Sequence, residues 1–153
     1  MADTYLVSAC LLGLCTRYDG GNNRNDQVLR FCADHLCVPV CPEQLGGLPT
    51  PRPAAEINGG DGAAVLDHKC AVLDRTGADV TSAFKLGAEQ VLLLARLYSV
   101  RGAVLKSRSP SCGSGQIHDG SFQDHHIDGD GVTAALLKRS GIAVHSELDL
   151  PGT

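Results

Sequence analysis

Three cysteines of this sequence each follow a short apolar run: Cys10 follows YLVSA, Cys41 follows VPV, and Cys112 follows AVL and a polar turn. The Lys, Ser, Pro and Gly residues around Cys112 cannot continue a buried strand, so the chain must turn there. Each thiol is therefore expected on a loop at the carboxyl end of a strand.

Three thiols that converged in the folded chain would form a set of soft ligands, which selects zinc, copper(I) or an iron–sulfur cluster. Structural zinc sites and cubane clusters usually take four protein ligands. Three cysteines would leave one metal position open, as a Lewis-acid catalyst requires. Because the three are far apart in the sequence, only the tertiary fold can bring them together, and ordinary buried thiols remain an alternative.

Length and charge limit the class of protein and its partners. A chain of 153 residues predicts a single domain, and an aromatic content of 4% without tryptophan predicts an aliphatic core. A net charge of −4 and the absence of a Lys/Arg run argue against a nucleic-acid or anionic-membrane surface. The expected partner is therefore a small molecule.

The cysteine count favours a reducing compartment. Seven cysteines are an odd number, and no basic amino-terminal segment with an apolar run and cleavage site precedes them, so a secreted disulfide framework is not expected. The longest apolar run is too short to span a bilayer. We therefore expect a cytoplasmic protein.

Strand-like and helix-like segments alternate along the chain. Short apolar runs predict strands at residues 5–9, 38–40, 103–105 and 142–145. Apolar residues at helical spacing predict three helices: one from Asn25 or Asp26 to about 36, one at about 82–100 capped by Asp79 or Thr81, and one at 132–139.

Three other segments lack a clear periodicity. Four prolines between residues 42 and 60 predict an irregular binding or lid segment. Residues 64–74 are expected to form one or two edge strands or a hairpin. A Gly-, Asp- and His-rich stretch, QIHDGSFQDHHIDGDG, follows Cys112 and is expected to be a loop.

The alternation of strands and helices predicts the fold class. It is typical of a single-domain α/β protein, a three-layer sandwich with a mostly parallel, Rossmann-like sheet over residues 1–153. Ligands of such sheets bind beyond the carboxyl ends of the strands. The three cysteines that follow strands are therefore expected to converge there.

Motifs along nearly the whole chain resemble those of the 2-thiouracil desulfidase family. In order, they are VSACLLG, RYDGG, VPVCPEQLGGLPTPRPAAEI, GADVT, the GA pair at 87–88, AVLKSRSPSCGSGQIHDGSF and DGDGVTAALL. The combination of CPE and GGLPTPRP with K-x-x-SPSCG is specific to that family.

This resemblance implies an oxygen-sensitive 4Fe-4S cluster held by Cys10, Cys41 and Cys112, with the fourth iron open. It further implies the removal of sulfur from a thiolated pyrimidine, 2-thiouracil to uracil plus sulfide, without net redox chemistry. Two other functions remain open from the residues alone. They are a hydrolase with Cys112 or Cys41 as nucleophile, and a carrier of sulfur or iron without catalysis.

The resemblance points to Glu43, two residues after Cys41, as the acid/base group. An ion pair of Glu43 with Lys106 or Arg52 is the alternative. Ser109 is expected to act in catalysis or substrate positioning. Four further residues near the cysteines in sequence are candidates for substrate contacts: Ser8, Asp19, Lys106 and Ser111, the last of which is also suited to a turn.

Four cysteines and three histidines receive no role. In the family, a cysteine often directly precedes RYDG, whereas here Thr16 holds that place and Cys15 lies one position earlier. Cys32 is expected in the core, Cys37 at the end of the same helix, and Cys70 is unassigned. The three histidines could bind a divalent metal or shuttle protons, but a solvated loop explains them equally well: His118, His125 and His126.

Overall fold

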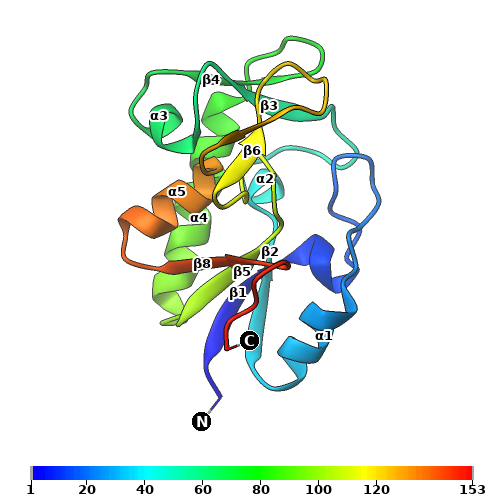
Figure 1. Cartoon of the computed structure of the whole chain (residues 1–153), viewed down its shortest axis with the longest axis vertical. Coiled ribbons are helices and arrows are strands. Elements are labelled where there is room, and N and C mark those ends of the chain that lie inside the picture. The colour runs from blue at the N-terminus through cyan, green and yellow to red at the C-terminus, as the bar shows by residue number, and fades with distance from the viewer. Residues whose placement is uncertain (1, 153) are drawn as a thin grey trace.

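A four-stranded parallel sheet forms the centre of the molecule, and this computed structural model describes residues 2–152 (Figure 1). Its strand order is β2-β1-β5-β8, with bounds Leu36–Val40, Thr4–Ser8, Gly102–Leu105 and Ala143–Ser146. The middle strands β1 and β5 are almost entirely buried, as expected for strands covered on both faces. The predicted parallel α/β sheet is confirmed.

Helices cover both faces of this sheet and give three layers. On one face, α1 (Asp26–Ala33) packs Val28 and Phe31 against Tyr5, Val7 and Val104. On the other face lie α4 (Thr81–Leu97) and α5 (Val132–Arg139), as Figure 1 shows. Their cluster contains the alternate strand residues, which are Leu6, Ala103 and Leu105.

A second group of short elements lies beyond the carboxyl edge of the sheet, at the top of Figure 1. It comprises α2 (Pro42–Leu45), α3 (Gly62–Leu66) and two antiparallel hairpins. The hairpins pair β3 (Ala55–Asn58) with β4 (Ala71–Asp74), and β6 (Gln116–His118) with β7 (His126–Asp128). A hydrophobic cluster that includes Phe84 of α4 joins this group to the central layers.

Two predicted helices differ from the observed ones at their ends. Asn25 caps α1, because its side chain accepts hydrogen bonds from the amides of Gln27 and Val28. The helix ends at Ala33 rather than near residue 36, because β2 already begins at Leu36. Cys37 therefore lies in β2, opposite Tyr5 of β1. The helix α4 begins after Val80, although Asp79 accepts from the Thr81 amide as a cap would.

Three segments contain more regular structure than the sequence predicted. Residues 64–74 do not form a hairpin of their own, since α3 occupies the first part and β4 pairs with β3 instead. The proline-rich segment contains α2, which begins with Pro42 in the favoured first helical position, and β3 beyond its last proline. The stretch after Cys112 forms the β6–β7 hairpin.

Among residues 2–152, no helix combines the length and the apolar character needed to cross a membrane.

Two glycines allow α2 to lie directly against α4. A Cβ on Gly87 would collide with the carbonyl of Pro42, and one on Gly46 would collide with the carbonyl of Ala83. The backbones of the two helices therefore touch without intervening side chains. This contact fixes the segment that carries Cys41.

Replacement of Gly87 by Ala should therefore push α2 away from α4. We expect the free energy of unfolding to fall by about 1–3 kcal/mol, the usual effect of overpacking a close contact. Anaerobic urea denaturation measures this. Glu89→Ala, at an exposed position two residues further along α4, is the control and should change the free energy of unfolding little. An unchanged value for Gly87→Ala would show that the helices can separate without loss.

Candidate active site

A cavity of about 520 Å³ lies between the carboxyl edge of the sheet and the hairpins beyond it. Eight of the nine residues singled out from the sequence line it: Ser8, Cys10, Cys41, Glu43, Lys106, Ser109, Ser111 and Cys112. Asp19 does not line this cavity. Its side chain is exposed, pairs with Arg17 at 3.2 Å and accepts from the Gly21 amide, so it shapes the turn of its own loop.

Sheet topology explains why the three cysteines share one cavity. The strand β1 pairs with β2 on one side and with β5 on the other, all in parallel. Cys10 lies in the short 3-10 helix that directly follows β1, and Cys41 directly follows β2 as the residue before α2. Cys112 lies in the turn after β5. Their loops are therefore neighbours at one edge of the sheet.

Each of the three sulfur atoms has a polar neighbour. The hydroxyls of Ser8 and Ser111 each lie 3.6 Å from the sulfur of Cys112, and both donate to it. The amide of Asn23 donates to the sulfur of Cys10 at 3.4 Å, and Arg52 Nη2 lies 4.0 Å from the sulfur of Cys41. Such donors stabilise thiolates that bind a metal.

Without a bound cation, the surroundings favour the protonated form of two of these thiols, Cys112 and Cys10. Burial, together with the nearby thiols of Cys10 and Cys41, raises the pKa of the Cys112 thiol to about 12 against the lowering effect of the two hydroxyls. Burial also raises the pKa of Cys10, with Asn23 acting in the opposite direction. A thiolate nucleophile needs a lowered pKa, so this environment favours metal binding over nucleophilic attack.

The three sulfur atoms do not form the compact group that a single bound ion requires. Three sulfurs around one tetrahedral zinc would lie about 3.8 Å apart, from its usual zinc–sulfur distance. Among the described residues, a group of three possible ligands within 4.8 Å of one another occurs elsewhere, and the three thiols do not form such a group. Soft donors around a wider space fit a polynuclear iron–sulfur cluster.

Glu43 is held beside the cysteines by a largely buried ion pair. Arg52 Nε lies 3.1 Å from Glu43 Oε1, and their side chains are 4% and 15% exposed. The other carboxylate oxygen, Oε2, accepts from the Ser111 hydroxyl at 3.3 Å. Lys106 pairs with Glu147 instead, at 3.1 Å. The sequence suggested two ion-pair partners for Glu43, Lys106 and Arg52, and the observed partner is Arg52.

The two serines before Cys112 have different surroundings. The Ser109 hydroxyl oxygen accepts from the backbone amides of Ser111 and Cys112, both at 3.1 Å, so Ser109 builds the turn. Ser111 is the serine whose hydroxyl contacts both Glu43 and the Cys112 sulfur. We expected Ser111 to stabilise the turn, but the hydrogen bonds that stabilise it are those of Ser109. Both side chains line the cavity.

Ser8 and Lys106 connect two strand ends. The Ser8 hydroxyl accepts from the Lys106 amide at 2.9 Å and donates to Cys112, so it is a buried link between the ends of β1 and β5. The Lys106 ammonium lies 3.1 Å from Glu147 and from the Ser107 carbonyl. Lys106 thus brings a partly paired positive charge to the cavity wall.

Sequence reasoning missed several residues that line the cavity, among them Asn23 and Glu56. His118 and His126 also line it. The sequence indicated these two histidines as possible metal ligands or proton carriers, with a solvated loop as an equal alternative. Four cysteines lie outside the cavity lining: Cys15, Cys32, Cys37 and Cys70. Burial and the neighbouring Cys32 raise the pKa of the Cys37 thiol to about 12.

The parallel α/β fold with a cysteine-lined cavity at its strand ends defines a class of protein built to hold a metal centre. A family model described as 2-thiouracil desulfurase matches residues 5–149. The uncharacterized protein YbbK of Bacillus subtilis strain 168 is 43% identical over 145 residues, which cover 95% of this chain and 96% of that protein.

A solved structure gives the same result. The 4Fe-4S-dependent thiouracil desulfidase TudS has a TM-score of 0.85 to this chain and 43% sequence identity, with 97% of this chain and 93% of that chain covered. This chain belongs to the 2-thiouracil desulfurase family.

Removal of Arg52 should destabilise the site, because it leaves the largely buried Glu43 carboxylate without its positively charged partner. Arg52→Met is expected to lower the free energy of unfolding by about 3–5 kcal/mol, measured by anaerobic urea denaturation. Arg24→Ala is the control, since its pair with Asp26 is exposed and should contribute less than about 1 kcal/mol. Equal effects of the two substitutions would contradict a structural role for the buried pair.

Proposed function

We propose that this protein is a 4Fe-4S-dependent desulfidase that converts a thiolated pyrimidine, such as 2-thiouracil, to uracil and sulfide. One observation carries the proposal: Cys10, Cys41 and Cys112 line a single cavity together with the paired carboxylate of Glu43. The family match and the likeness to the solved structure of a thiouracil desulfidase support it.

The three cysteines are the ligands we assign to the cluster. Their soft donor type and the hydrogen bonds to their sulfurs fit such a centre. When bound by three cysteines, a 4Fe-4S cluster supplies a sulfur-seeking Lewis acid at the iron that has no protein ligand.

The polar side chains of the cavity then handle the water and the protons. Hydrolysis adds a water oxygen to the ring carbon and releases its sulfur as sulfide, so the water must lose protons as the carbon–sulfur bond breaks. We assign proton transfer to Glu43, because Arg52 anchors one of its oxygens while the other faces Ser111 and the Cys112 turn.

The remaining lining residues have positioning roles in this proposal. Ser8 and Ser111 hold the Cys112 sulfur, and Ser109 fixes the turn. Lys106 and Arg52 add positive charge near a centre that gathers three thiolates. Asp19 is not included, because it points into its own exposed turn. The cavity volume lies in the range of small-molecule sites.

A cysteine nucleophile is a weaker explanation of the same site. Its thiol would need activation by a base, whereas the hydrogen-bond partners of Cys112 are the hydroxyls of Ser8 and Ser111 and its pKa is raised. The cluster and the seven thiols also suit a reducing compartment. We therefore place the enzyme in the cytoplasm, acting on a small molecule without a nucleic-acid or membrane partner.

The direct test is to reconstitute the protein without oxygen, to quantify its iron and sulfide, and to assay free 2-thiouracil. We expect about four of each atom per chain and release of uracil with sulfide. A colourless protein that is fully active would support the thiol nucleophile. A protein that binds the cluster but leaves free thiouracil intact would support a carrier.

Replacement of Cys112 by Ser should abolish cluster binding and turnover together, because a hydroxyl is a poor ligand for iron in this setting. Iron analysis after anaerobic reconstitution measures it. Cys70→Ser is the matched control, since Cys70 donates to the Asp61 carbonyl outside the cavity and should keep its iron. Full iron content in the Cys112 variant would refute the ligand assignment.

Replacement of Glu43 by Gln should keep the cluster and slow the reaction. The amide oxygen can still accept from Arg52, but it cannot take up a proton, so kcat should fall roughly 10²- to 10⁴-fold. Visible absorption reports the cluster and uracil release reports the rate. Glu89→Gln, on the exposed surface of α4, should match the wild type. A wild-type rate in Glu43→Gln would remove Glu43 from the mechanism.

A further inference from the structure

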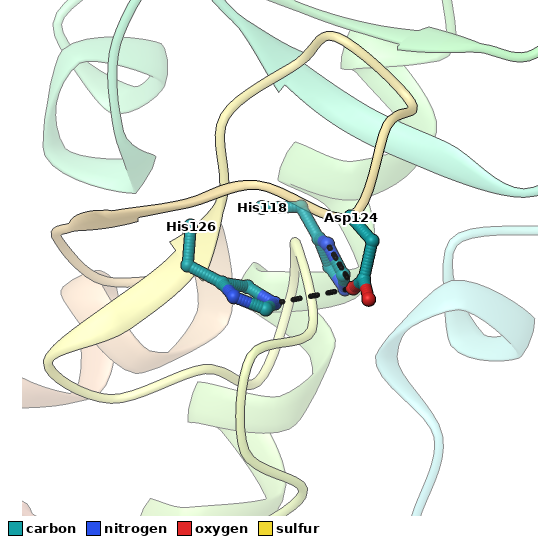
Figure 2. Close-up of side chains that lie close together, drawn as sticks. All are labelled: His118, Asp124 and His126. Carbon is teal, nitrogen blue, oxygen red and sulfur yellow. Dashed lines mark ion pairs between the residues drawn. The ribbon is translucent and has the colours of Figure 1, made fainter.

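Three side chains at the mouth of the cavity, outside the proposed catalytic set, form a compact group of metal-binding type. His118, Asp124 and His126 offer one ligand atom each, and these atoms all lie within 4.8 Å of one another. Figure 2 shows both imidazole rings directed toward the same carboxylate. All three residues line the cavity that also contains the cysteines.

The hairpin register brings the two histidines together. In the β6–β7 pair, His118 lies directly opposite His126, so both side chains project from the same face of the hairpin. Their ring centroids are 4.6 Å apart. Asp124 is supplied by the connecting loop, two residues before His126. The juxtaposition therefore depends on strand pairing and not on a sequence motif.

Both histidines carry a buried ring nitrogen that has no hydrogen-bond partner, His118 Nδ1 and His126 Nε2. Native structures rarely leave such atoms unpaired, so each requires an explanation. The same two nitrogens lie 3.9 and 3.6 Å from one oxygen of Asp124, Oδ1. These distances are too long for hydrogen bonds, and the two nitrogens surround one small volume together with that oxygen.

A metal ion explains this spacing. Nitrogen and oxygen ligands at usual zinc distances in a tetrahedral arrangement are separated by about 3.3 Å, which is shorter than the two observed nitrogen–oxygen distances of 3.6 and 3.9 Å. The Asp124 side chain is 86% exposed, so a small rotation can close the difference without disturbing the core. A second carboxylate is also near, since Glu56 Oε2 lies 4.0 Å from His118 Nδ1.

The connecting loop is held in place independently of these three side chains. Glu56 Oε1 accepts from the amides of Gly120 and Phe122, at 2.9 and 3.1 Å. The Phe122 ring also lies under the Arg75 guanidinium, 5.2 Å from its centroid. Glu56 therefore both anchors the loop and stands beside the histidines, as an outer carboxylate does at many metal sites.

We propose that His118, Asp124 and His126 bind a divalent transition-metal ion, with zinc as the best match to two imidazoles and one carboxylate. Such a three-residue set leaves at least one coordination position free. Because all three residues line the cavity, that position opens to the same space as the cysteines. The protein would then carry a second metal centre, made of nitrogen and oxygen ligands, opposite the sulfur ligands.

The test uses anaerobically prepared protein that carries its cluster, so that the thiols are occupied. After dialysis against a chelator, it is titrated with Zn²⁺ alone by calorimetry, and the zinc environment is measured by X-ray absorption. We expect one equivalent with nitrogen and oxygen neighbours at about 2.0–2.1 Å and no sulfur at about 2.3 Å.

Variants identify the ligands. We expect zinc binding to weaken in both Asp124→Asn and His118→Ala, by more than the roughly 10- to 100-fold that loss of an outer partner causes. Asp124 is exposed, so its substitution does not endanger folding. His125→Ala is the matched control, because His125 lies between two proposed ligands but its side chain is 68% exposed and faces Asp119. It should bind zinc as the wild type does.

Three outcomes would overturn the proposal: no zinc binding, zinc with sulfur neighbours, or unchanged affinity in both His118→Ala and Asp124→Asn. Cluster content and thiouracil turnover are measured on the same samples. Failure of the zinc site with the cluster and turnover intact would leave the proposed desulfidase function standing, and the reverse result would leave the zinc site standing.

Discussion

The parallel pairing of β1 with β2 and β5 is the constraint on which the site depends. Parallel strands end at the same edge of a sheet, so the loops that follow neighbouring strands must lie side by side. Each of the three loops places a cysteine close to its strand end. The sheet therefore assembles a set of sulfur ligands from segments that are far apart in the chain.

Short local structures then fix each thiol. A 3-10 helix carries Cys10, the first residues of α2 follow Cys41, and a turn built on the Ser109 hydroxyl presents Cys112. The close contact of α2 with α4 extends this control to Cys41, because glycine at the contact leaves no room for adjustment. Ligand positions are thus set by backbone packing and not by long, mobile side chains.

The second group of elements supplies the polar side of the cavity. Arg52 arrives from the proline-rich segment and pairs with Glu43, and the same guanidinium reaches the Thr16 carbonyl at 2.9 Å. The hairpin β6–β7 adds His118 and His126 beyond them. The cavity therefore has sulfur ligands on the sheet side and titratable oxygen and nitrogen groups on the hairpin side. Burial raises the pKa of the Cys112 thiol, and a bound metal centre would oppose this effect because it favours the thiolate.

The sequence by itself determined the elements whose signal is local. The wholly apolar run at 103–105 predicted a buried strand, and Asn25 before a helical pattern predicted the start of α1. The motifs around Cys41 and Cys112 identified the family before any contact was known. In residues 64–74 the expected strand is present as β4, but the sequence did not identify the helix α3, because five apolar residues do not distinguish the two periods.

Only the tertiary structure decided which side chains meet. Glu43 forms its ion pair with Arg52 and not with Lys106, because the proline-rich segment brings Arg52 back to α2. Lys106 follows β5 and pairs instead with Glu147, which follows β8. His118 and His126 became neighbours through hairpin register, and Asp19 was turned away from the cavity by its own loop. Lys106 and Glu147 are far apart in the sequence, and even the closer pairs depend on strand pairing and packing, which a single sequence does not display.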